Sequence, residues 1–257
     1  MAPSIDLSRE RSVWAILRST LSLYRDYPWL FLLLALAVIA PWDLIKLGIT
    51  GAGPFGHLNH TSFLGRQSLD LLNVSFIDPL VSALHIHAVV AIGKGQRPRL
   101  AAVARSGVRV LPTVGIAALA AGVAIPIGFL ALVIPGLILW IRLSVVAQTA
   151  AVEQGGVRAA LRRSWRLTRF DQGHIFGLLL VVGVLVSGSS LGGYALGSGS
   201  GSNAGALALG VAINTIVASF TALTTALLYF DLQARELSPR HPREHQYARD
   251  LDPASDP

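Results

Sequence analysis

The chain has 257 residues, of which 53% are hydrophobic and only 14% are charged, and its mean hydropathy is +0.58. A soluble domain typically carries about 25% charged residues, so this composition excludes a water-covered globular protein and indicates a bundle of membrane helices. The formal net charge is +7 and there is no cysteine, which excludes disulfides, thiol nucleophiles and cysteine metal sites.

The first predicted element is an amphipathic helix over residues 11–25, with apolar side chains on one half and arginines on the other. This pattern is typical of a helix lying in a membrane interface, and a surface helix of a soluble domain is the alternative. A membrane span follows over 29–49, because crossing about 30 Å of hydrocarbon takes roughly 20 apolar residues. Asp43 and Lys46 share one of its faces, which predicts an ion pair or, alternatively, an ion site.

A glycine-rich loop over 50–68 contains His57 and His60. A metal site needs three or four ligands, so no metal or other cofactor is predicted here. The second span is expected over 71–92, interrupted at Asp78 by the proline that follows it. An acid inside a span is a candidate functional site, and the alternative is a pair with an arginine of a neighbouring helix.

A second interfacial helix is predicted over 98–109, followed by a third span over 111–133. Pro135-Gly136 predicts a tight turn, and the fourth span covers 137–152. Arg142 lies inside this span, where an arginine costs several kcal/mol unless it pairs, faces the bundle or reaches an interface.

Asp78 is the first candidate partner, so Asp78 and Arg142 form the candidate intramembrane polar pair. The third interfacial helix is expected over 156–169, with its arginines on one arc of the helical wheel. Nucleic-acid binding is the weaker interpretation of those charges, because the helix lies between two apolar spans. No nucleic-acid partner is therefore expected.

Two further spans are predicted over 175–194 and 204–230, with Asn214 as a polar interruption of the last. The membrane domain is then 1–235, and 236–257 is expected to be a disordered cytoplasmic tail. The fold class is all-α, a polytopic bundle of six transmembrane helices with three interfacial helices. The N-terminus lacks the pattern of a cleaved signal peptide.

The basic residues indicate the orientation in the membrane. The N-terminal segment, residues 93–109 and 153–174 and the tail hold 18 of the 21 lysines and arginines. All four segments fall on the same side of a six-span arrangement, which by the positive-inside rule is the cytoplasm. The expected location is a bacterial cytoplasmic (inner) membrane, with both termini cytoplasmic.

The three interfacial helices share an Ala-x-x-Arg-Ser sequence, at Ala102–Ser106, Ala160–Ser164 and residues 15–19. Each precedes a pair of spans, which predicts three units of one interfacial helix and one transmembrane hairpin. The same helices supply the candidate contacts for anionic lipid headgroups: Arg11, Arg18, Arg25, Arg99, Arg105, Arg109, Arg158, Arg162, Arg163, Arg166 and Arg169.

Residues 134–177 resemble the glycerophosphoryl diester phosphodiesterase membrane domain family of bacterial and archaeal multi-pass proteins. The matching residues are Ile134-Pro135-Gly136, Arg142, Glu153, Ala160-Leu161-Arg162-Arg163-Ser164, Leu167-Thr168-Arg169, the closing segment Leu228–Arg235, and Leu23-Tyr24-Arg25 near the start. Gln233 departs from the family pattern, where a basic residue is usual. The resemblance implies a polytopic membrane protein, and the phosphodiesterase activity belongs to a separate domain for which this chain has no room.

The expected function is that of a non-catalytic membrane protein, not an enzyme, which interacts with membrane lipids and with a membrane-protein partner or a second copy. The alternative is a small-solute transporter or channel component, based on the proline-broken spans and on Asp78, Arg142 and Asn214. A membrane-embedded enzyme is disfavoured, since no His-Glu-x-x-His or Gly-x-Ser-x-Gly pattern occurs in the sequence.

Overall fold

The computed structural model describes residues 7, 9–51, 63–96, 98–153, 155–169, 171–197 and 204–238, and these form helices and connections with no strand among them. The elements in chain order are α1 (Val13–Asp26), α2 (Pro28–Thr50), α3 (Phe63–Leu72), the π-helical segment η1 (Asn73–Ile77), α4 (Asp78–Gly93), α5 (Leu100–Ala131), α6 (Val133–Arg142), α7 (Val146–Val152), α8 (Gly156–Leu167), α9 (Gln172–Gly197) and α10 (Ala204–Leu237).

Five helical segments of the described chain are long and apolar enough to cross a membrane, as in a multi-pass membrane protein. They are Pro28–Thr50, Leu100–Ala131, Val133–Val152, Gln172–Gly192 and Ala204–Leu237. The second predicted span corresponds to α3, η1 and the shorter apolar helix α4. The π-helical turn immediately precedes Asp78-Pro79, where the proline ring removes a backbone donor. The irregularity therefore lies just before Asp78, and the chain stays helical through Asp78 itself.

The predicted interfacial helix 98–109 and the predicted span 111–133 are one helix, α5, which continues through Pro112. Treating them as two elements was wrong, and the second of the three predicted units has no separate interfacial helix. The described glycines with positive φ, which commonly mark helix ends, lie at positions 51, 95 and 156 and not inside this stretch. Without such a stop signal the helix continues.

Pro135-Gly136 is not the turn that the sequence predicted. The chain reverses at Leu132, whose backbone is extended, and Pro135 lies in the first turn of α6, where proline is tolerated. Gly136 packs directly against α5, since a Cβ added to it would lie 2.6 Å from the backbone nitrogen of Phe129. The glycine therefore allows two helices to approach closely.

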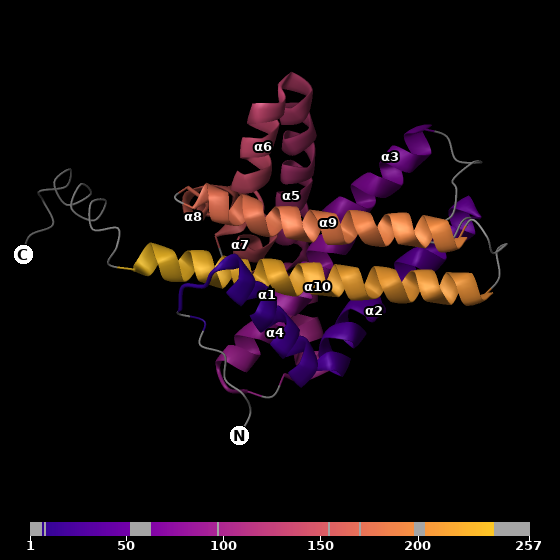
Figure 1. The fold of residues 1–257 in the computed structure, drawn as a ribbon, viewed down its shortest axis with the longest axis horizontal. Coiled ribbons are helices and arrows are strands. Elements are labelled where there is room, and N and C mark those ends of the chain that lie inside the picture. Colours follow the sequence, from indigo (N-terminus) through magenta and orange to yellow (C-terminus); the bar gives the residue numbers. More distant parts are fainter. Residues whose placement is uncertain are drawn as a thin grey trace, which may run out of the picture.

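The core surrounds the C-terminal half of α10, where Leu227, Leu228 and Tyr229 are fully buried. α1 packs against this half: the Thr20 and Thr224 hydroxyl oxygens lie 3.4 Å apart. α1 is thus attached to the bundle by a buried face. Figure 1 shows α9 and α10 side by side, with the α5–α6 hairpin rising across their direction.

The last helix is longer than the predicted span. α10 runs to Leu237, so Glu236 and Leu237 belong to the helix and not to a disordered tail. Residues 239–257 lie outside the described residues, as do His57 and His60 of the predicted loop.

Candidate functional site

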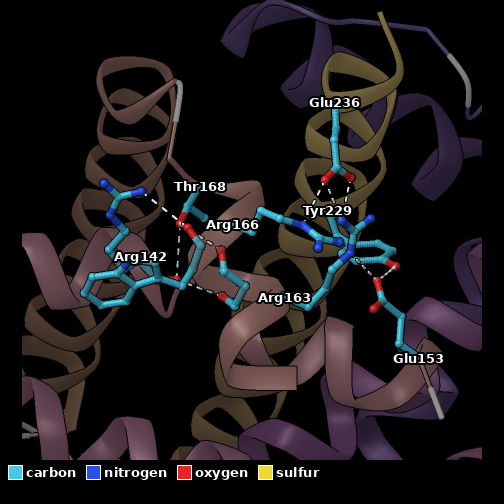
Figure 2. Close-up of polar contacts among 9 residues, drawn as sticks. Arg142, Glu153, Arg163, Arg166, Thr168, Tyr229 and Glu236 are labelled. Carbon is cyan, nitrogen blue, oxygen red and sulfur yellow. Dashed lines mark hydrogen bonds and ion pairs between the residues drawn. The ribbon is translucent and has the colours of Figure 1, made fainter. Parts of the chain in front are cut away.

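Helix α8 is a basic helix, and most of the polar contacts drawn in Figure 2 involve its residues. It begins at Gly156, whose φ of +74° favours glycine, directly after the chain leaves α7. It contains no proline and is rich in alanine, leucine and arginine, which are good helix formers. Ala160, Ser164 and Leu167 form its buried face, so α8 has one side against the protein.

Hydroxyl groups fix that buried side to the break between α6 and α7. Because the helix ends after Arg142, the carbonyl group of Arg142 has no regular helical donor. The Ser164 hydroxyl donates to this carbonyl oxygen at 2.8 Å, and the Thr149 hydroxyl of α7 donates to the Ala160 carbonyl at 3.0 Å. These bonds explain why α8 lies against the end of a broken span.

Arg163 joins α8 to α7 and α10 (Figure 2). Its Nε donates to Glu153 Oε1 at 2.8 Å and its Nη1 to Glu236 Oε1 at 2.7 Å, while its side chain is only 13% exposed. The Tyr229 hydroxyl donates to Glu153 at 3.1 Å, and Arg166 Nε lies 3.1 Å from Glu236. We call Glu153, Arg163, Tyr229 and Glu236 the Arg163 network.

Together with Arg166, the Arg163 network contains two guanidinium groups and two carboxylates, so its charges are balanced. Burial works to lower the pKa of Arg163, but its hydrogen bonds and charge contacts with Glu153 and Glu236 outweigh burial and raise that pKa above its ordinary value. The guanidinium group therefore stays charged and holds both carboxylates.

A second cluster attaches α1 and α9 to the same end of α10. The carboxylate of Asp231 is fully buried and accepts from Arg235 Nε at 2.8 Å and from the Arg11 backbone N–H. Arg235 also donates to Asp171 at 3.0 Å and to the Arg11 carbonyl at 2.7 Å. A buried carboxylate needs such partners to offset its desolvation.

The arginines predicted to contact lipid headgroups fall into two groups in the structure, those that are at least half-buried and those that are exposed. Arg163 points into the protein, and Arg11 is half-buried with its backbone held by Asp231 and Arg235. Placing Arg163 on the lipid-facing arc was wrong, because a helical wheel cannot show that Glu236 lies opposite. The remaining arginines of the predicted set are exposed: Arg18, Arg25, Arg99, Arg105, Arg109, Arg158, Arg162, Arg166 and Arg169.

Asp78 and Arg142 are not brought together, and no ion pair joins these two described residues. Arg142 lies at the end of α6, where its Nη1 donates to the Trp165 carbonyl at 3.3 Å and its guanidinium lies 5.2 Å from the Trp165 ring centroid. The Asp78 carboxylate instead accepts a hydrogen bond from the Asn73 side-chain amide at 3.0 Å, and it interacts electrostatically with Lys46. The break after α6 places Arg142 beside α8 and away from Asp78.

A separate polar cluster joins α2 and α10. Lys46 Nζ lies 2.7 Å from Asp43 Oδ1, so the ion pair predicted from their spacing is confirmed. Asn214 donates to both carboxylate oxygens of Asp43, at 3.0 and 3.3 Å. Asn214, the polar residue within the last span, thus forms hydrogen bonds with the buried carboxylate of Asp43 in the first span.

Sequence reasoning missed the polar contacts in the centre of the bundle. His85 is fully buried, with Nδ1 2.7 Å from the Val81 carbonyl oxygen and Nε2 2.7 Å from the Ser219 hydroxyl. Since a carbonyl only accepts, Nδ1 carries a proton. Gln148 similarly donates to Ser82 and Thr225, both at 2.8 Å. In the sequence, His85 and Gln148 are visible only as polar residues inside apolar runs, and this pattern does not show which residues of other helices they contact.

A family model described as a domain of unknown function (DUF7847) matches residues 60–232. No curated protein and no solved structure matches the chain. The description of the family names no activity and does not mention the phosphodiesterase membrane domain, so the resemblance seen in residues 134–177 stays a prediction.

Proposed function

The chain belongs to this family of unknown function, DUF7847, and we propose that it is a non-catalytic integral membrane protein that holds anionic lipid headgroups against α8. The observation that carries the proposal is the division of α8 into two sides. Ser164 and Arg163 attach one side to the bundle, and Arg158 and Arg162 are exposed on the other.

Such an arrangement suits lipid phosphates for two physical reasons. Guanidinium groups donate paired hydrogen bonds to phosphate oxygens, and each basic residue near an anionic surface contributes about 1 kcal/mol. Because the Arg163 network holds α8 in place, its outer arginines meet the membrane without first having to order the helix.

We further propose six crossings, with α3–α4 as the second, in a bacterial cytoplasmic membrane with both termini in the cytoplasm. The support is the concentration of 18 of the 21 basic residues in the four segments expected on one side. Exposed Trp14 and Leu21 share a face of α1 with Arg18 and Arg25, so the predicted separation of this helix into an apolar and a basic half was wrong. A mixture of long apolar and basic side chains on one face suits a membrane interface.

Lipid selectivity of the full chain in vesicles tests the proposal. Spin-labelled phosphatidylglycerol should associate with the protein more strongly than spin-labelled phosphatidylcholine, and added salt should weaken the difference. The double variant Arg158→Gln/Arg162→Gln should lower the ratio of the two association constants several-fold. Arg158→Lys/Arg162→Lys keeps the charge and should retain most of it. Equal association of both lipids with the unmodified chain would refute the proposal.

A transporter or channel component is the second candidate, and the buried Asp43 cluster is the feature of the described residues on which it would depend. Both carboxylate oxygens of Asp43 are already occupied by Asn214, and Lys46 neutralises the charge. These contacts describe a completed structural pair better than a site for a moving ion. Solute flux through reconstituted protein that Asp78→Asn abolishes would favour transport over lipid contact.

A further inference from the structure

Arg166 lies between the outer arginines of α8 and the Arg163 network. Its side chain is 64% exposed, whereas the side chain of Arg163 is only 13% exposed. Arg158, Arg162 and Arg166 follow one another at intervals of four residues, so they form a row along one side of the helix. Within the described contacts of this row, Arg166 is the arginine that reaches α10, because its Nε lies 3.1 Å from Glu236 Oε1. Arg166 is therefore both exposed and held.

The contact with Glu236 leaves the outer end of the Arg166 guanidinium available. The ion pair is made at Nε, and neither Nη1 nor Nη2 of Arg166 donates a hydrogen bond to another described residue. These two nitrogens carry four N–H groups in a planar fork, which can bind two phosphate oxygens at once. An arginine loses rotamer freedom when it binds a ligand, and a side chain that is already held loses less.

The charge of Glu236 is compensated within the protein. Figure 2 shows Arg163 and Arg166 directed at this carboxylate from the same helix. Arg163 Nη1 donates to Glu236 Oε1 at 2.7 Å, and together with Glu153 the group has two guanidinium groups and two carboxylates. An approaching phosphate therefore meets no net negative charge here. A carboxylate in the last turn of a helix is disfavoured by the helix dipole, so these arginines account for the position of Glu236 at the end of α10.

We infer that Arg166 binds the phosphate group of an anionic lipid and that Glu236 positions its guanidinium for this contact. The inference rests on the proposed contact of α8 with anionic lipid and assigns one fixed binding group within it. Arg158 and Arg162 attract the headgroup by their charge, whereas Arg166 adds a directed pair of hydrogen bonds. Glu236 acts through Arg166 and is a positioning residue.

A glutamine at position 236 separates positioning from charge. The measured quantity is the preference of the full chain for spin-labelled phosphatidylglycerol over spin-labelled phosphatidylcholine in vesicles. If charge alone decided it, Glu236→Gln would strengthen the preference, because the chain becomes more positive. If Glu236 positions Arg166, the preference should fall about twofold or more. Glu153→Gln changes the charge equally and also removes a partner of Arg163, but it leaves Arg166 and Glu236 together, so it should not lower the preference.

Variants of Arg166 test the paired hydrogen bonds without touching the partners of Arg163. Arg166→Lys keeps the charge beside Glu236 but lacks the planar fork, and it should lower the preference roughly twofold or more. Arg158→Lys should leave the preference nearly unchanged, because that side chain acts by charge. Glu236→Gln should have no further effect in a chain that already carries Arg166→Gln, since the positioned group is then absent.

Three results would overturn the inference. The first is a preference that is unchanged or stronger in Glu236→Gln, which would leave its contact with Arg166 a surface ion pair. The second is an unchanged preference in Arg166→Lys. The third is loss of the preference in inorganic phosphate but not in chloride of equal ionic strength, because the site would then serve free phosphate.

These outcomes are distinct from failure of the proposed function. If the unmodified chain prefers phosphatidylglycerol and the variants at 166 and 236 match it, the role of Arg166 and Glu236 fails while the contact of α8 with lipid stands. If the unmodified chain shows no preference, the proposed function fails as well.

Discussion

Single side chains decide whether α8 is attached to the bundle. Glu153 and Glu236 are about one-third exposed and are both held by Arg163. Removing one partner of such a set leaves charges that must return to water through a partly closed surface, which costs more than the net stabilisation by the pairs. Arg163 is therefore the arginine of α8 whose loss should affect the fold most.

We expect Arg163→Gln to lower the free energy of unfolding by about 2 kcal/mol, since the carboxylates of Glu153 and Glu236 lose their common partner. Thermal unfolding in detergent measures this change. Arg158→Gln, on the same helix but exposed, should have little effect. Equal destabilisation by both variants would mean that the Arg163 network does not hold α8.

Ser164 and Ser106 occupy the same place in the shared Ala-x-x-Arg-Ser sequence, but only Ser164 is buried. Ser164→Ala removes the donor to the Arg142 carbonyl and should cost about 1 kcal/mol in the same unfolding measurement. Ser106→Ala should be near neutral because this residue is exposed. A similar loss for both would show that helix propensity, not the bond to Arg142, sets the cost.

At the scale of elements, the α5–α6 hairpin depends on close contact between two backbones. A Cβ at Gly136 would clash with both the ring and the backbone of Phe129, and one at Gly128 would lie 3.0 Å from the Gly136 Cα. Small residues at such crossings let membrane helices approach within van der Waals contact of their backbones.

Gly136→Ala should therefore destabilise the protein by about 1–3 kcal/mol, because the hairpin must open to admit the methyl group. Gly183→Ala, at a position with open space, should be neutral or slightly stabilising, since alanine favours helix more than glycine. Thermal unfolding of both variants compares the two effects. An unchanged thermal stability of Gly136→Ala would contradict the close packing of α5 against α6.

At the scale of the whole molecule, helix lengths and directions require tilt. At 1.5 Å per residue α5 and α10 are about 48 and 51 Å long, which exceeds the roughly 30 Å of hydrocarbon. Figure 1 shows the hairpin crossing the direction of α9 and α10. Helices that are too long and that cross one another fit a bilayer by tilting in different directions.

Single cysteines test the proposed orientation. A membrane-impermeant thiol reagent should label Arg158→Cys only from the cytoplasmic side and Leu132→Cys, at the tip of the hairpin, only from the opposite side. The chain without introduced cysteine is the blank, because it has none of its own. Labelling of both positions from one side would contradict the orientation inferred from the basic residues.

Particular residues show which contacts could be predicted from the sequence and which could not. The spacing of Asp43 and Lys46 predicted their pair, because i, i+3 positions of one helix must share a face. The pairing of Arg142 with Asp78 could not be judged in the same way, since it depended on where two different helices end. The link between Arg163 and Glu236 also escaped prediction, as 73 residues separate them.

The sequence by itself determined a helical chain with several apolar segments and its basic residues between them, because composition and periodicity act locally along the chain. Only the tertiary structure decided which arginines face inward, that α5 is continuous, and that Gly136 serves packing instead of a turn. The physical reason is that burial, ion pairing and backbone contact depend on the neighbours that folding brings from other helices.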